Sequence, residues 1–365
     1  MNASTEWIPL RIADAGRMAA AGLVAAGEKQ ARETIRKLLR PDARHHCAYA
    51  GYAADDPSPK CVALVTVIDP DARRGLLRWI DGTSMEQEHL KGFLLELAGI
   101  AFFQLGLHRL EMPVPIGEDA FCEAATGIGM VREGKLLNAV FNGRLHGNAW
   151  SFVLLRPQYR RRGYGFVPFS KGLVTVLGEG DQVEQIGFVH NDEYPSDPYL
   201  GECLAYRGYL DREGRVVNLR DSSVAAQDAA PVPEEVAVAC GQLEEYFSHR
   251  RSTFDIRTAL PAHASAFQRR VWDILRGIGY GHVWTYEDVA AELVDGTRED
   301  ARRMTRAVGA ACAANPLAIV VPCHRVIGKD GKLTGFSGGV DIKEQLLAHE
   351  WIVPDEGHGK EEQTQ

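Results

Sequence analysis

The pentapeptide Pro322-Cys323-His324-Arg325-Val326 carries the residue types best suited to nucleophilic chemistry. It directly follows the apolar run LAIVV at 317–321, so the cysteine is expected at the end of a buried segment. A cysteine is a nucleophile only as the thiolate, and a neighbouring base or cation is what lowers its pKa. Adjacency in the chain does not by itself turn the His324 ring toward the sulfur. Taken alone, the pair also fits a buried structural cysteine.

Five segments around this cysteine extend the pattern. They are, in order, FQRRVWDIL at 267–275, TYEDVA at 285–290, RAVGAACAANP at 306–316, IVVPCHRVIGKDGKLTGFSGG at 319–339 and KEQLLAHE at 343–350. Together they closely resemble the O6-alkylguanine-DNA alkyltransferases, the suicide repair methyltransferases. Five motifs in order over this length make a specific match, and they argue strongly against a merely structural cysteine.

The resemblance implies a role for each polar residue of the site. Cys323 would accept the alkyl group, His324 would deprotonate it through a water molecule, and Glu350 would hold the imidazole in the required tautomer. Asn315 would brace the turn between the DNA-binding helix and the active-site segment. Tyr286 would donate a proton or hydrogen bond, because guanine leaves poorly unless its growing charge is neutralised. From the residues alone, Tyr286 could also be a packed core aromatic, and Glu350 a surface acid at a helix end.

The same resemblance implies a substrate pocket. Ser337 and the backbone of Cys323 and Val326 would contact the base edge. Phe336 stands where many relatives carry tyrosine, a difference that bears on how the lid over the pocket closes. The zinc-binding cysteine and histidine set of some relatives is not found in this sequence, so no metal is expected. The transfer itself needs no cofactor.

Residues 286–293 and 301–314 have the spacing of a helix-turn-helix, and Thr285 fits an N-cap. Most such proteins read the major groove through long side chains of the second helix. Here that helix offers small residues, which suits sequence-independent docking in the minor groove of double-stranded DNA, as the resemblance also implies, with the alkylated base flipped out. Arg306 would fill the space that the base leaves, and the helix is locally basic, although its charges could also be a merely solvated face. The predicted DNA-binding residues are Arg302, Arg303, Arg306, Ala307, Gly309 and Ala310.

These residues are positioned by a chain of 365 residues, a length that is typical of two or three domains. We expect an α/β and α+β architecture: a mixed sheet with helices over 1–160, a small α/β subdomain and linker over 165–256, the helical catalytic domain over 257–352, and a disordered tail over 353–365. The resemblance implies an RNase H-like fold for the small subdomain. Periodicity predicts helices over 30–39, 90–105, 238–247, 266–278, 286–293 and 301–314, strands over 61–68, 109–114 and 149–155, a hairpin over 172–189, and a polar linker over 211–236.

The front of the chain resembles the GNAT acetyltransferases of the ribosomal-protein type. The matching pieces, AFFQLGLHRLEMPV and GIGMVREGKLLNAVFNGRLHGNAWSFVLL, lie within residues 98–156. Acetyl-CoA pyrophosphate binds a Gly-rich loop and a helix N-terminus, but Met85-Glu86-Gln87-Glu88 stands there, and its carboxylates would repel phosphates. The run RRRGYG at 160–165 fits a pyrophosphate pattern without opening a helix, so we interpret it as a basic interdomain linker that could touch DNA phosphates. The front half is therefore expected to be a degenerate acetyltransferase fold without cofactor.

The composition limits the classes of protein to which this chain can belong. Hydrophobic residues make up 45% and charged residues 25%, which is ordinary globular usage, and the net charge of −8 excludes a uniformly basic chain. Seven scattered cysteines without a CxxC pair argue against a disulfide framework, and His45, His46 and Cys47 suggest a loop or a surface position rather than a metal site. No apolar run reaches the ~18 residues of a membrane span and no secretory leader is visible, so we expect a cytoplasmic monomer without a membrane partner.

These observations predict a DNA repair protein. It would transfer a methyl or small alkyl group from O6 of guanine to Cys323, once per molecule, with O4-methylthymine as a second substrate implied by the resemblance. Two alternatives stay open: a non-catalytic sensor of alkyl damage, and an acetyl-CoA-dependent N-acetyltransferase tethered to DNA. The presence of Cys323 argues against the first, and the missing Gly-rich loop argues against the second.

Overall fold

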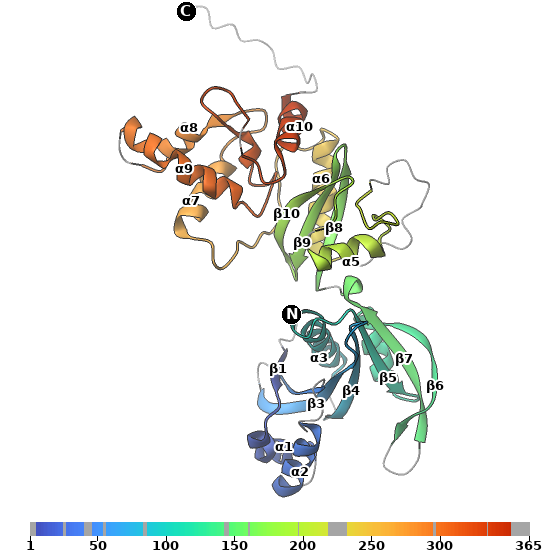
Figure 1. Cartoon of the computed structure of the whole chain (residues 1–365). Coiled ribbons are helices and arrows are strands. Elements are labelled where there is room, and N and C mark those ends of the chain that lie inside the picture. Colours follow the sequence, from blue (N-terminus) through green and yellow to red (C-terminus); the bar gives the residue numbers. More distant parts are fainter. Residues whose placement is uncertain are drawn as a thin grey trace, which may run out of the picture. The chain divides into compact units, whose positions relative to one another are not determined.

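The computed structural model describes the chain apart from residues 1–4, 25–26, 40–45, 54–55, 83–85, 142–145, 160, 196, 218–231, 295–296, 334 and 352–365. The chain divides into two compact units, residues 1–161 and 162–365 (Figure 1). Both units combine helices with a β-sheet, so the fold is mixed α/β, as predicted. The predicted tail over 353–365 lies outside the described residues. Among the helices that are described, none combines the length and the apolar character needed to cross a membrane.

A seven-stranded sheet organises the first unit, in the order β1-β2-β3-β4-β5-β7-β6. Neighbouring strands are antiparallel except β4 and β5, which are parallel because α3 crosses between them. The predicted strands lie within β3, β5 and β7. The elements are β1 (Thr5–Pro9), α1 (Ala15–Ala20), α2 (Glu28–Leu38), β2 (His46–Ala53), β3 (Asp56–Asp69), β4 (Arg74–Gly82), α3 (Gln87–Gly99), β5 (Arg109–Pro115), α4 (Asp119–Gly127), β6 (Val131–Phe141) and β7 (His146–Leu155).

Alternate residues of β3 supply two separate hydrophobic cores. Cys61 and Val65 belong to the cluster that contains α3 and α4, whereas Val62 and Leu64 belong to the cluster that contains α1 and α2. The two clusters lie on opposite faces of the sheet because successive strand side chains point to opposite sides. The helix predicted over 90–105 is α3, which continues as a π-helical turn over Ile100–Gln104.

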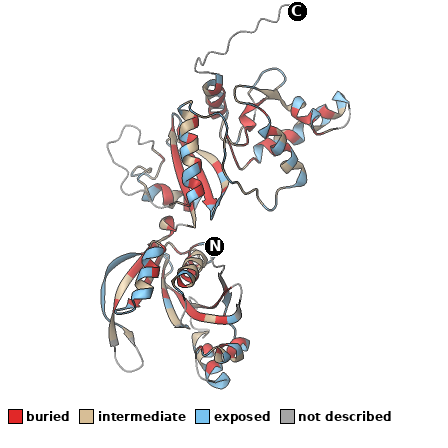
Figure 2. Cartoon of the chain, turned by 180° about the vertical axis from the view of Figure 1, so that it is seen from behind, coloured by how far each residue is buried: buried red, intermediate tan, exposed pale blue. Residues whose placement is uncertain are grey.

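The second unit begins with a three-stranded antiparallel sheet made of β8 (Arg162–Phe169), β9 (Gly172–Glu179) and β10 (Gln182–His190). The predicted hairpin is the β9–β10 pair. On one face of the sheet lies α6 (Glu234–Phe247), whose Ala239 and Leu243 share a core with β8, β9 and β10 (Figure 2). Residues of α5 (Pro198–Tyr206) form a separate core with other side chains of β8, β9 and β10.

The linker predicted over 211–236 is too long at its C-terminal end. Helix α6 already begins at Glu234, and Val236 is fully buried in the core. The acidic Glu234 and Glu235 gave this stretch a polar character, but acids in a first turn favour helix formation through the helix dipole. Residues 218–231 of that stretch lie outside the described residues.

The rest of the second unit is helical. The helices predicted over 238–247, 266–278, 286–293 and 301–314 are present as α6, α7, α8 and α9, with ends that differ by a few residues. The short strands β11 and β12 pair in parallel. Trp272 of α7 is buried and donates from Nε1 to the carbonyl of Ala311 in α9 at 2.9 Å. The elements are α7 (Ala266–Arg276), β11 (Trp284–Thr285), α8 (Tyr286–Ala291), α9 (Arg298–Ala313), β12 (Val326–Ile327) and α10 (Val340–Trp351).

The sheet and the helical part meet immediately before the cysteine segment. The Ile186 amide of β10 donates to the carbonyl of Pro316 at 2.8 Å, and the Ala318 amide donates back to the carbonyl of Ile186 at 3.1 Å. The buried run at 317–321 is therefore attached to the sheet by backbone hydrogen bonds at its first residues.

The N-cap of α9 yields a stability prediction. Thr297 Oγ1 accepts from the Asp300 amide at 3.4 Å, while Asp300 Oδ2 accepts from the Thr297 amide at 3.0 Å. Replacing Thr297 with alanine should lower the free energy of unfolding by about 1 kcal/mol, measured by urea denaturation. Thr305→Ala, in the interior of the same helix, is the control and should change little because alanine is a better helix former. Equal losses in the two variants would contradict a specific cap.

Candidate active site

Cys323 lies at the end of a tight buried turn. The Val321 amide donates to the carbonyl of Leu317, and the Cys323 amide donates to the carbonyl of Val321, both at 2.8 Å. Ile319 between them has a φ of 71°, a left-handed conformation that is rare for a β-branched residue. Cys323 then opens a 3-10 turn, Cys323–Arg325, and its side chain is only 2% exposed.

Asn315 connects the end of α9 to the cysteine. Its amide nitrogen Nδ2 donates to the carbonyl of Val321 at 2.7 Å and to Cys323 Sγ at 3.1 Å. Its Oδ1 accepts from the Leu317 amide at 3.0 Å. Asn315 therefore holds both ends of the turn and places a hydrogen-bond donor on the sulfur.

His324 and Glu350 form a fully buried pair. His324 Nε2 lies 2.8 Å from Glu350 Oε1, and the two side chains are 0% and 1% exposed. An ionised carboxylate only accepts hydrogen bonds, so Nε2 carries the proton and Nδ1 keeps its lone pair. Nδ1 has no hydrogen-bond partner in the described part of the chain. Burial lowers the pKa of His324 against the opposing effect of Glu350, so the ring is neutral at pH 7 and can act as a base.

The Glu350 carboxylate accepts hydrogen bonds from further residues. Arg325 donates to it from Nε and Nη2, each at 2.8 Å, and the Tyr246 hydroxyl of α6 donates at 2.8 Å. Burial alone would raise the pKa of Glu350, but the hydrogen bonds from His324 and Arg325 outweigh it and lower the pKa to about 2. Neither Arg325 nor Tyr246 was among the predicted site residues. Arg325 belonged to the quoted pentapeptide, whereas no local signal marks Tyr246.

The thiol itself is held in its neutral form. Burial raises the pKa of Cys323, and the Asn315 hydrogen bond and the charge of Lys343 offset only part of that effect. Lys343 of α10 is fully buried, donates from Nζ to the carbonyl of Val326 at 2.6 Å and lies 5.8 Å from the centre of the Tyr286 ring. Lys343 was also missed, although it begins one of the quoted segments.

The predicted pocket residues occupy three kinds of position. Val326 is fully buried in β12, Phe336 is half-buried against the main core of the second unit, and Ser337 is exposed. Tyr286 is half-buried at the start of α8 and packs against the same core. A Cβ added at Gly309 of α9 would lie 3.8 Å from the Tyr286 ring, so these two predicted residues are neighbours.

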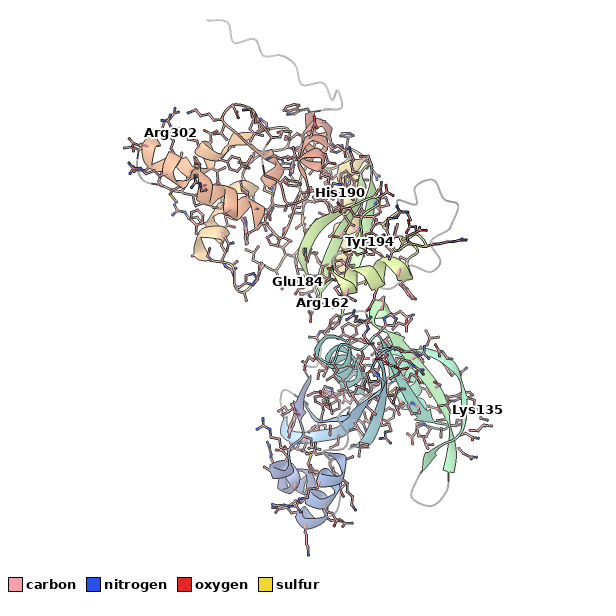
Figure 3. All side chains as sticks on the ribbon, viewed as in Figure 1. Lys135, Arg162, Glu184, His190, Tyr194 and Arg302 are labelled. Carbon is pink, nitrogen blue, oxygen red and sulfur yellow. The ribbon has the colours of Figure 1, made fainter. Side chains whose placement is uncertain are left out.

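The predicted DNA-binding residues share an exposed side of α9. Arg306, Ala307 and Ala310 are exposed and Gly309 is half-buried. Arg302, labelled in Figure 3, donates to Glu287 at 3.2 Å, and Arg303 donates to Glu299 at 3.1 Å. The excess of arginines counted in the sequence is therefore partly neutralised, because Glu287 comes from the neighbouring helix α8.

The first unit carries carboxylates at the start of α3. Glu86 occupies the N-cap without a side-chain capping bond, and Glu88 in the first turn pairs with Lys91 at 2.7 Å. Residues 162–169 form strand β8, so the arginine-rich run opens no helix, as expected. The interpretation of this run as a linker is wrong for residues 162–165, because they pair with β9 as part of the sheet. His45, Met85 and Arg160, which entered the sequence argument, lie outside the described residues. No group of three or more potential metal ligands occurs among the residues described.

The pKa of Glu350 leads to a pH-dependent prediction. Because folding depresses that pKa from 4.5 to about 2, ionised Glu350 stabilises the fold above pH 4.5, and this contribution is lost as the pH falls toward 2. Wild type should exceed Glu350→Gln in free energy of unfolding by on the order of 3 kcal/mol at pH 7, with a shrinking gap below pH 4.5. Denaturation at several pH values measures this gap. Exposed Glu344→Gln on the same helix is the control, and a pH-independent gap would contradict the assignment.

A comparison with known proteins finds a family match within the second unit. The model of the family described as 6-O-methylguanine DNA methyltransferase, DNA binding domain, matches residues 266–352. The methylated-DNA–protein-cysteine methyltransferase of Methanosarcina barkeri is 47% identical over 109 residues, which are 30% of this chain and 64% of that protein. The chain thus spans somewhat less than two thirds of this relative.

Solved structures give further likenesses. The Mycobacterium tuberculosis OGT in complex with DNA is 29% identical, with 52% of this chain and 92% of that one covered and a TM-score of 0.37. A spermidine N-acetyltransferase chimera from Vibrio cholerae is 14% identical, with 41% of this chain and 95% of that one covered and a TM-score of 0.35.

The Haemophilus influenzae relative matches a longer part of this chain. This methylated-DNA–protein-cysteine methyltransferase is 31% identical over 189 residues, which are 52% of this chain and 86% of that protein. With this coverage and the buried Cys323, His324 and Glu350 in place, the chain belongs to the methylated-DNA–protein-cysteine methyltransferase family.

Proposed function

We propose that this protein repairs DNA by moving a methyl or small alkyl group from O6 of guanine to Cys323. The observation that carries the proposal is a buried thiol followed by a neutral histidine whose Nε2 is bound to Glu350. In the transfer, sulfur attacks the alkyl carbon while the bond from that carbon to O6 breaks. The product is a thioether, which water does not hydrolyse, so each molecule acts once and no cofactor takes part.

Proton movement follows from the tautomer of His324. The proton on Nε2 faces Glu350, so Nδ1 is the atom that accepts the thiol proton, through a water molecule. The leaving guanine takes a proton or hydrogen bond from Tyr286. Burial keeps the resting thiol protonated, so the nucleophile forms only when the base acts on it. Val326, Phe336 and Ser337 line the substrate pocket in this proposal, and Asn315 positions the sulfur.

Double-stranded DNA is the proposed partner, bound in its minor groove through α8 and α9 as a helix-turn-helix. The exposed Ala307 and Ala310 and the half-buried Gly309 allow the backbone of the duplex to approach α9 closely. Arg306 is exposed and forms no ion pair with any residue that the structure describes, so it is available to enter the stack when the damaged base flips out. Arg302 and Arg303 would contact phosphates by giving up their hydrogen bonds to Glu287 and Glu299 for bonds to phosphate oxygens.

The remaining proposals concern the other parts of the chain. We assign residues 165–256 to an RNase H-like subdomain and linker and residues 257–352 to the catalytic domain, with O4-methylthymine as a second substrate. For residues 1–160 we propose a degenerate GNAT-like fold that packs or binds rather than acetylates, because Glu86 and Glu88 stand where phosphates would need a positive helix end. We further propose that the protein works in the cytoplasm as a monomer.

Mass spectrometry after incubation with excess O6-methylguanine duplex tests the transfer. Wild type should gain a single methyl group, mapped to Cys323, and stop at one per chain. Cys323→Ala should gain none and still bind the duplex. Cys312→Ala, which removes another buried thiol of the same core, should still gain one. Methylation of Cys323→Ala, or no adduct on folded wild type, would overturn the proposal.

The role of Arg306 is tested by comparing two substrates. Arg306→Ala should slow repair of duplex DNA by at least about tenfold, because unstacking a base costs a few kcal/mol that the arginine offsets. Its reaction with free O6-benzylguanine, which needs no flipping, should be nearly unchanged. Arg303→Ala on the same helix is the matched control and should weaken duplex repair only at low salt. Equal losses on duplex and free base for Arg306→Ala would show that it does not assist flipping.

A further inference from the structure

A glycine-rich turn over residues 336–339 connects the predicted pocket to α10. The Gly339 amide donates to the carbonyl of Phe336 at 3.0 Å and closes the turn. Gly339 has a φ of +98°, and a Cβ there would lie 2.7 Å from Asp341 Oδ1. Glycine is therefore required at this position, and the turn has a defined shape.

His190, labelled in Figure 3, is the last residue of β10 and contacts this turn from the sheet. Its Nε2 lies 2.8 Å from the carbonyl oxygen of Gly338. A carbonyl only accepts hydrogen bonds, so Nε2 is the donor. The other ring nitrogen, Nδ1, lies 3.9 Å from Asp341 Oδ2, and Lys171 Nζ lies 3.8 Å from the same oxygen. Asp341, in the first turn of α10, thus lies beside the second nitrogen of the ring.

Phe188, two residues earlier on the same face of β10, supports the turn by contact. Its ring centre lies 5.9 Å from that of Phe336. A Cβ added at Gly338 would lie 2.7 Å from Phe188 Cδ2, so the turn backbone rests directly on this ring. Phe188 is in turn packed against Phe169 of β8, at 5.6 Å between ring centres. The turn therefore cannot move toward the sheet without displacing an aromatic cluster.

We propose that His190, supported by Phe188, is a positioning residue that latches the 336–339 turn and so limits the size of the alkyl group that reaches Cys323. The inference rests on the proposed function, in which Phe336 and Ser337 border the alkyl pocket. A methyl group is transferred with the turn in place. A benzyl group requires the turn to shift, which the hydrogen bond to Gly338 and the Phe188 contact oppose. The sheet of the second unit thereby takes part in substrate selection without touching the substrate.

Two substitutions at His190 separate the hydrogen bond from the bulk of the side chain. His190→Leu removes the donor, and His190→Gln keeps an amide donor at comparable reach. The full chain is reacted with duplexes that differ only in carrying O6-methylguanine or O6-benzylguanine, and the rate of transfer to Cys323 is measured for each. The benzyl-to-methyl rate ratio should rise about fivefold in His190→Leu, as expected for one lost hydrogen bond, and return toward wild type in His190→Gln. The control is His263→Leu, an exposed histidine before α7, which should leave the ratio unchanged.

Hydrogen exchange of the segment 335–343 gives a second readout that needs no alkyl transfer. Exchange should be faster in His190→Leu than in wild type or His190→Gln. An unchanged exchange rate, an unchanged benzyl-to-methyl ratio, or equal slowing with both substrates would overturn the latch. If wild type alkylates no cysteine while the exchange difference is present, the proposed function fails and the latch on the turn stands as a structural finding without a role in selection.

Discussion

The carboxylate of Glu350 is a buried negative charge, and the architecture around Cys323 depends on satisfying it. An ion removed from water is costly unless it is paired and hydrogen-bonded. Here the donors are His324, Arg325 and Tyr246, with the Gly281 amide at 3.3 Å. They come from the 3-10 turn after Pro322, from α6 and from the loop after α7. Satisfying one charge therefore holds together segments that are distant in the chain.

The same charge decides what the histidine can do. Glu350 fixes the proton of His324 on Nε2, and burial keeps the ring neutral, so a lone pair remains on Nδ1. Burial also keeps the Cys323 thiol protonated, with Asn315 as a hydrogen-bond donor to the sulfur. A neutral thiol followed by a neutral base suits the proposed single transfer to Cys323, because an exposed thiolate would react with other electrophiles. The reactivity of this site is therefore set by the burial and orientation of neutral side chains rather than by a permanently charged thiolate.

The surface of α9 shows how neighbours set the charge of a helix. Glu287 of α8 accepts from Arg302 at 3.2 Å and from Lys329 at 3.0 Å. These ion pairs brace the helix and the loop after β12 against α8. The small residues of α9 remain on the outer side, together with Arg306, for which the described residues supply no ion-pair partner. The helix thus presents small residues and arginines whose charge is partly offset by neighbouring carboxylates.

The sequence alone specifies the local features of this protein. The helices α7, α8 and α9 are marked by apolar periodicity, α8 also by its cap Thr285, and the β9–β10 hairpin by two apolar runs around a polar turn, because these signals act within a few residues. The nucleophilic segment at Cys323 is equally local. The order of strands in the first unit and the partners of Glu350 were decided by tertiary structure. Tyr246 donates a hydrogen bond to Glu350 across 104 residues of sequence. The orientation of the His324 ring depends on its own hydrogen bond to the same carboxylate. A buried charge takes its donors from whichever segments the packed core brings beside it, and no spacing within a segment encodes that choice.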